Sequence, residues 1–133
     1  MPDKTVAQKL LIKEGHTVLL VKAPRGYQAT LGALPEGARL IRSAAKPADV
    51  VQLFVANRAE LEAELPKIKD AVRWLSPSKP GGILWVTYLK GTAKTKTDIN
   101  RDTLHAYART IELEGVSLVS IDDDWSAMRF KRL

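Results

Sequence analysis

Short continuous runs of apolar residues, many of them β-branched, recur along the chain and predict strands buried on both faces of a sheet. The runs occupy residues 17–22, 49–55 and 83–89. Weaker alternation of apolar and polar positions at residues 38–42 is typical of an edge strand. Alternating runs at residues 116–121 and 127–131 are close enough along the chain to form a hairpin.

Helical periodicity fills the longest interval between these strands. From Leu61 to Leu75 apolar residues recur at spacings of four and three, which places them on one helical face. Asn57, with Glu60 three residues later, resembles a capping box at the start of this helix. We expect Pro66 to interrupt the helix, either by kinking it or by restarting it, because proline lacks an amide hydrogen.

Other helices are expected on either side of this central region. Asp98 or Asn100 is suited to cap a helix that Gly115 closes. Shorter helices are expected over residues 6–12 and 27–34. Strands that alternate with helices imply right-handed parallel crossovers.

The sequence therefore predicts a single α/β domain over residues 1–133. We expect an open, mostly parallel sheet of about six strands, with helices on both faces and a C-terminal antiparallel hairpin. In such sheets a ligand lies beyond the carboxyl ends of the strands, at the point where the strand order reverses.

The amino-acid composition excludes several classes of site and of protein. The chain has 133 residues and no cysteine, which excludes a disulfide scaffold, thiolate zinc, an iron–sulfur cluster and a cysteine nucleophile. No apolar run approaches the length of about 20 residues that a membrane span needs, and the first residues do not form a signal-like apolar stretch. We therefore expect a cytoplasmic protein without a membrane partner.

The net charge of +6, from 21 Lys and Arg against 15 Asp and Glu, permits an anionic partner. The positive residues are spread along the chain, no expected helix carries a basic stripe, and the tryptophans are not interleaved with lysines, so nucleic acid is not expected as a partner. One local concentration of positive charge follows the strand at residues 83–89.

The candidate ligand-binding residues lie after the predicted strands, where charge-assisted hydrogen bonds could hold a small anion. They are Arg25, Gly26, Lys90, Lys94 and Lys96, with Trp125 as an adjoining wall. Two alternatives stay open for the lysines. They form a solvated loop that aids solubility, or they face the acidic turn at residues 122–124 and balance its charge.

Other candidate groups are assigned no catalytic or metal role. His16 lies at the amino end of the first strand, and His105 is expected to face solvent, so surface or structural roles are favoured for both. Without cysteine or a histidine pair at a ligand spacing, no metal is expected. The three consecutive carboxylates from Asp122 to Asp124 are typical of a solvated turn.

Three segments in order resemble a trimmed class I S-adenosylmethionine (SAM)-dependent methyltransferase: Ile12 to Leu20 entering the first strand, Ala48 to Val51 opening a middle strand, and Lys79 to Leu84 opening the next. Thr97-Asp98-Ile99 before a helix and Asp124-Trp125-Ser126 before the last strand are similar to a family of small bacterial proteins classed as a domain of unknown function. That family has a minimal methyltransferase-like, Rossmann-type sheet. The resemblance implies a fold, and it carries no activity with it.

The chain departs from the methyltransferase pattern in two places. Residues 22–27 contain one glycine where those enzymes have a glycine-rich turn, and Arg42-Ser43 stands where they have an acidic residue for the ribose. Our first hypothesis is therefore a small bacterial protein that is not a functional methyltransferase and uses no cofactor. It would bind a small anionic ligand or a protein partner at the carboxyl-end edge of the sheet.

Two alternatives are retained. One is a divergent SAM-dependent methyltransferase. The other is a structural or interaction protein that forms homo-oligomers through an exposed flank of the sheet, at residues 38–42, or through its apolar helix faces.

Overall fold

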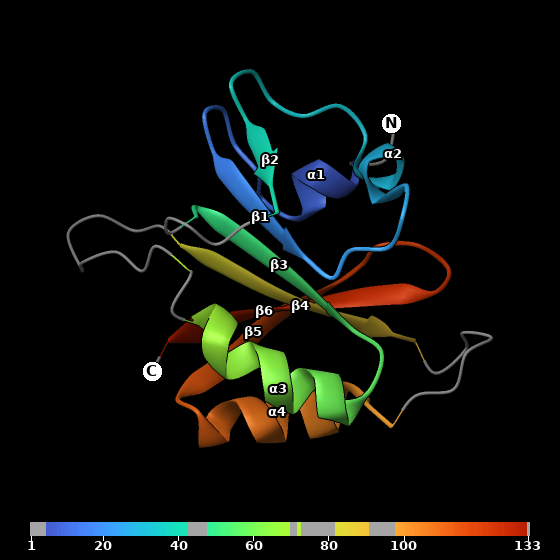
Figure 1. Ribbon diagram of the computed structural model, residues 1–133, viewed down its shortest axis with the longest axis vertical. Coiled ribbons are helices and arrows are strands. Elements are labelled where there is room, and N and C mark those ends of the chain that lie inside the picture. The colour runs from blue at the N-terminus through green and yellow to red at the C-terminus, as the bar shows by residue number, and fades with distance from the viewer. Residues whose placement is uncertain (1–4, 43–47, 70–71, 73–81, 91–97, 133) are drawn as a thin grey trace.

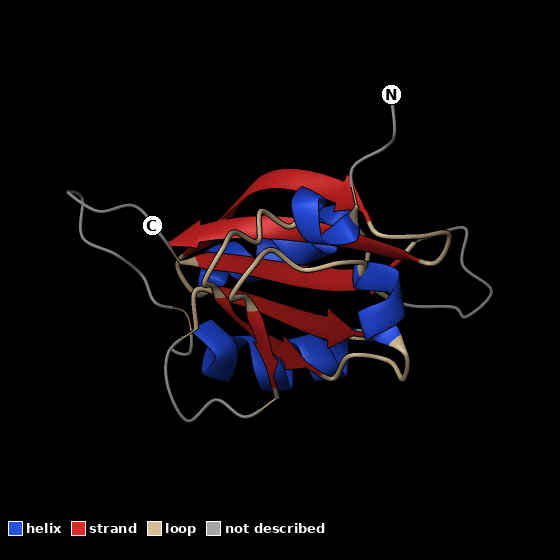
Figure 2. Cartoon of the chain, turned by 90° about the horizontal axis from the view of Figure 1, so that it is seen from above, coloured by secondary structure: helices blue, strands red, loops and turns tan. Residues whose placement is uncertain are grey.

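The computed structural model describes residues 5–42, 48–69, 72, 82–90 and 98–132. Its strands form one twisted sheet with helices on both sides (Figures 1 and 2). The strands are β1 (Thr17–Val21), β2 (Arg39–Ile41), β3 (Val50–Val55), β4 (Ile83–Leu89), β5 (Leu113–Ser120) and β6 (Trp125–Arg132). The helices are α1 (Val6–Lys9), α2 (Tyr27–Leu31), α3 (Arg58–Lys69) and α4 (Arg101–Thr110).

The described strands lie in the order β2-β1-β3-β4-β6-β5. The pairs β1–β2, β1–β3 and β3–β4 are parallel, and β6 pairs antiparallel with both β4 and β5. The predicted α/β class, the mostly parallel sheet and the C-terminal hairpin are confirmed. The strand predicted at residues 38–42 is also confirmed as an edge strand, because among the described strands β2 pairs with β1 alone.

Two apolar cores lie on the two faces of the sheet. On one face α1 and α2 pack over β1, β3 and β4, and on the other α3 and α4 pack over the same sheet (Figure 1). Strand β3 is buried at every position because both faces of its centre are covered, as its continuous apolar run predicts. The core therefore holds β1, β3 and β4 rigidly and fixes the positions of the loops that follow them.

Helix α3 continues through Pro66, so a restart of the helix at this residue is wrong, and a kink there stays a prediction. Proline has no amide hydrogen and leaves the carbonyl four residues earlier, that of Glu62, without its helical partner. The hydroxyl of Tyr107 on α4 donates to the Glu62 carbonyl at 3.4 Å. A side chain from the neighbouring helix thus replaces the missing bond, and both α3 and α4 stay packed on the sheet.

The predicted length of this helix also needs correction. It ends at Lys69, and Val72 forms an isolated parallel bridge with Ala48 while remaining buried. The apolar face predicted up to Leu75 therefore holds for Leu61 to Ile68, and Leu75 lies outside the described residues. Asn57 caps the helix as predicted, since its Oδ1 accepts a hydrogen bond from the Glu60 amide at 2.9 Å.

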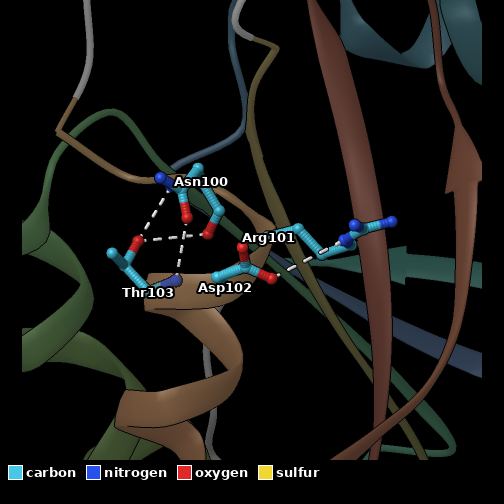
Figure 3. A network of polar contacts seen from close by, with 4 residues as sticks. All are labelled: Asn100, Arg101, Asp102 and Thr103. Carbon is cyan, nitrogen blue, oxygen red and sulfur yellow. Dashed lines mark hydrogen bonds and ion pairs between the residues drawn. The ribbon is translucent and has the colours of Figure 1, made fainter.

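Asn100, one of the two predicted caps, begins helix α4. Its Oδ1 accepts from the Thr103 amide and its own amide donates to Thr103 Oγ1, both at 2.9 Å, beside an Arg101–Asp102 ion pair (Figure 3). The predicted closure at Gly115 is wrong: the helix ends at Thr110. The left-handed residue Glu112, with φ of 65°, turns the chain, and Gly115 lies within β5 opposite Phe130.

No helix in the described ranges has the length and apolar character needed to cross a lipid bilayer.

Candidate functional site

The strand order reverses between β1 and β3, because the chain passes from β1 to β2 on one side and later enters β3 on the other. Ligand crevices of open α/β sheets lie outside the carboxyl ends of the strands at such a point. Here residues 22–27 follow β1 and residues 56–60 lead from β3 into α3. These two segments form the candidate crevice.

An ion pair spans the crevice. Lys22 Nζ lies 3.5 Å from Glu60 Oε2, with side chains 42% and 32% exposed. The other carboxylate oxygen of Glu60 accepts from the Ala56 amide at 2.8 Å, so the acid is fixed to the loop after β3. Lys22 has a φ of 59°, a left-handed conformation that turns the chain sharply at the end of β1. The crevice therefore presents one fixed anion and one cation side by side.

The candidates after β1 lie at this same place. Arg25 is exposed, and Gly26 has a φ of 82° with open space where a Cβ would stand. A ligand can therefore approach the Gly26 backbone closely, and Arg25 offers a cation beside it. Lys94 and Lys96 lie outside the described residues.

Lys90 and Trp125 lie further along the sheet. The amide of Lys90 donates to the Asp124 carbonyl at 2.8 Å and its Nζ to Ser120 Oγ at 2.6 Å, which places it against the β5–β6 turn. Trp125 is half-buried, and its ring lies 5.2 Å from that of Phe54 in an edge-to-face contact. Both residues therefore lie at the hairpin end of the sheet, and the residue set proposed from the sequence stays a prediction.

A row of aromatic rings connects the two regions. Phe54 on β3 lies between Trp125 and Tyr27, the first residue of α2, whose ring centroid is 4.6 Å from that of Phe54. Because Gly26 immediately precedes Tyr27, the row joins the loop after β1 to the start of β6. Sequence reasoning missed this arrangement, because it depends on which strands are neighbours.

A buried series of hydrogen bonds connects α2, β3 and β4. The Tyr27 hydroxyl donates to Gln52 Oε1 at 2.9 Å, and Gln52 Nε2 donates to Thr87 Oγ1 at 2.8 Å. Gln52 and Thr87 are the buried polar residues of the described core, both fully inaccessible to solvent. These hydrogen bonds connect the start of α2 to β3 and β4, so the loop containing Arg25 and Gly26 is held at one end.

Burial raises the pKa of the Tyr27 phenol well above its ordinary value of about 10. Above pH 10 the unfolded chain ionises this group while the native protein keeps its proton, so the unfolded state binds fewer protons and stability falls. Between pH 9 and pH 11, the free energy of unfolding of the wild-type protein should fall by about 1 kcal/mol more than that of Tyr27→Phe. Urea unfolding of both proteins at each pH measures this difference, and equal losses would contradict the assignment.

The histidines differ in their placement. His16 Nδ1 accepts from the Lys13 amide at 3.0 Å and stabilises the turn before β1, which confirms a structural role. The prediction that His105 faces solvent is wrong: it is half-buried between α4 and β5, and its Nε2 is buried without a hydrogen-bond partner in the described structure. The helix lies against the exposed edge strand β5, and this packing covers the imidazole.

Residues 122–124, which carry three consecutive carboxylates, form a turn, as predicted. Asp122 Oδ1 accepts from the amides of Asp124 and Trp125 at 2.8 and 2.9 Å, so this carboxylate is used in shaping the β5–β6 connection. Within the described ranges no group of three or more His, Asp or Glu side chains is arranged to hold a metal ion. The charged side chains of the crevice therefore remain the groups available to bind a ligand at the point where the strand order reverses.

No family model matches this sequence, and no curated protein matches it. Among solved structures, the fold is similar to that of a DhpI–SAH complex, at 12% sequence identity over 96% of this chain and 82% of that chain, with a TM-score of 0.60. A SAM-dependent methyltransferase from Aquifex aeolicus is 14% identical over 93% of this chain and 88% of its own, with a TM-score of 0.57. An rRNA methylase from Streptococcus thermophilus is 12% identical over 100% and 99%, with a TM-score of 0.55.

At these identities the similarities show the fold alone. The chain has a Rossmann-like, methyltransferase-like α/β fold, as the sequence predicts.

Proposed function

We propose that this chain is a divergent methyltransferase-fold protein that binds SAM or its demethylated product, SAH, at the crevice beyond β1 and β3. This chain covers most of the length of solved structures with the same fold, among them a SAM-dependent methyltransferase, an rRNA methylase and a DhpI–SAH complex. These similarities support this alternative better than the hypothesis of a non-enzymatic protein. The main observation behind the proposal is the Lys22–Glu60 ion pair at the point where the strand order reverses.

The ion pair suits the amino-acid end of such a ligand. That end carries an ammonium and a carboxylate, and Glu60 and Lys22 offer the opposite charges within 3.5 Å of each other. A pair as exposed as this one stabilises the fold by only about 0–1 kcal/mol, so a zwitterionic ligand can exchange partners with it at small cost. Arg25 adds a second, exposed cation for the carboxylate.

The ribose end of the ligand fits less well. Arg42, exposed and cationic, follows β2 where methyltransferases place an acid. We therefore derive no methyl-transfer step and confine the proposal to ligand binding through the amino-acid end.

Calorimetry with SAM and with SAH tests the proposal. We expect both to bind, and Glu60→Gln to weaken binding about 10-fold, since a hydrogen bond to a charged group is worth about 1.5–3 kcal/mol. Lys22→Gln should weaken it similarly. Glu62→Gln and Lys67→Gln alter exposed residues of α3 outside the crevice segments and serve as charge-matched controls. The absence of both heat and thermal shift with either compound would overturn the proposal.

A second candidate is the binding of a small phosphate-containing anion without catalysis. It is favoured by the exposed cations Arg25 and Arg42, which follow the two neighbouring strands β1 and β2. In the same calorimetric series, binding of inorganic phosphate that Arg25→Gln weakens, without binding of SAM or SAH, would select this function.

The remaining sequence expectations stay predictions. They are membership of the small bacterial family, a cytoplasmic location, and self-association through the edge strand β2 or through the apolar helix faces.

A further inference from the structure

A groove of about 460 Å³ lies over β4, β6 and β5, on the sheet face that carries α1. It shares no residue with the crevice, which lies beyond β1 and β3. It is lined by Gln8, Lys9, Leu11, Trp85, Ser117, Val119, Ser120 and Arg129. Its volume is within the range of about 300–1,000 Å³ typical of small-molecule sites.

The floor of the groove is apolar. Trp85 is 1% exposed and its indole Nε1 already donates to the Leu10 carbonyl at 2.9 Å, so it closes the base of the groove and offers a ligand no free donor. Leu11 and Val119 are partly buried and pack against the same core cluster. A ligand in this groove therefore needs an apolar body.

The walls are cationic. Arg129 lies opposite Trp85 in the register of β6 with β4, and its Nε is buried without a hydrogen-bond partner in the described structure. An unpaired buried donor on a charged group costs at least about 1–3 kcal/mol, which an incoming acceptor recovers. The guanidinium suits a carboxylate or phosphate because it presents parallel donors.

Lys9 adds a second positive charge to the groove. Its Nζ donates to the Ser120 carbonyl at 3.1 Å, and both residues line the groove. Among the described residues that line the groove, none is acidic. The described lining therefore carries positive charge from Lys9 and Arg129, and the hydroxyl of Ser117 adds a neutral polar group.

We propose that this groove is a second binding site, for a small organic anion with an aromatic or aliphatic body and a carboxylate or phosphate head. The head lies against Arg129, Lys9 adds positive charge within the groove, and the body lies on Leu11 and Val119. The site is independent of the crevice and of the function proposed for it.

The test uses three probes with one apolar body: 2-naphthoate, 2-naphthyl phosphate and the uncharged 2-naphthamide. Calorimetry should show that at least one of the anions binds about 10-fold or more tightly than the amide, and the ranking of the two anions identifies the preferred head. Arg129→Gln should remove most of this preference. Lys67→Gln, an exposed charge change on the opposite face of the sheet, should leave it unchanged.

Lys9→Gln provides a second variant with a milder effect on packing, because Lys9 is partly exposed on α1. It should weaken binding of the anions and not of the amide. Equal binding of amide and anions, equal binding by wild type and Arg129→Gln, or no binding of either anion at millimolar concentration would each overturn the proposal. Binding of SAM or SAH in the crevice is measured separately, so failure of one site is distinguishable from failure of the other.

Discussion

Replacement of Phe54 by alanine should lower the free energy of unfolding by about 3–5 kcal/mol. Phe54 is 2% exposed on the central strand β3, and its ring lies between those of Tyr27 and Trp125. Truncation removes the transfer free energy of the ring and leaves a cavity that strands fixed on both sides do not close. The two edge-to-face contacts are lost as well.

Urea unfolding followed by tryptophan fluorescence measures the effect of Phe54→Ala. Phe54→Leu keeps most of the apolar volume and should cost less than about 1.5 kcal/mol. Leu118→Ala, at a side chain 44% exposed on β5, should change stability by no more than about 0.5 kcal/mol. A loss for Phe54→Ala as small as that for Leu118→Ala would show that the aromatic row does not form.

Replacement of Gln52 by leucine should destabilise the protein by about 2–4 kcal/mol, although leucine has nearly the same volume. Gln52 is fully buried and bonds Tyr27 on one side and Thr87 on the other. Leucine leaves the hydroxyl groups of Tyr27 and Thr87 buried in an apolar core without a hydrogen-bond partner, and each unpaired group costs about 1–3 kcal/mol. Chemical denaturation at neutral pH gives the value.

The same network offers its own control. The triple variant Tyr27→Phe, Gln52→Leu, Thr87→Val removes every polar side-chain group of this network, so none of them is left unpaired and most of the lost stability should return. If the triple variant were less stable than Gln52→Leu alone, the cost would come from packing and not from unpaired hydroxyls.

The strands could be predicted because their burial on both faces requires continuous apolar sequence. Residues 83–89 are predicted and observed as a strand with the same bounds, and the run at 49–55 differs from β3 by one residue. Helix ends were predicted less well. Pro66 and Gly115 are local signals, and each was outweighed by tertiary contacts: the Tyr107 hydroxyl bond in one case and strand pairing with Phe130 in the other.

The candidate sites depended on strand order, which a local pattern does not contain. Arg25 and Gly26 were proposed because they follow a predicted strand, and they stay predictions. The partner of Lys22 was not found, since Glu60 was interpreted only as part of a helix cap. Arg129 was interpreted as one polar position in an alternating strand, and only the sheet register places it opposite Trp85 above a groove.

The position of β6 between β4 and β5 has a consequence for synthesis of the protein on the ribosome. Strand β5 emerges before β6, and in the finished sheet it pairs with β6 alone. Until residues 125–132 follow, β4 keeps one side of its backbone unpaired, and its apolar side chains lie next to an open edge. Open apolar edges promote pairing with other chains. The nascent protein is therefore most prone to aggregate just before β6 is released, and a chaperone that holds this edge would act at that moment.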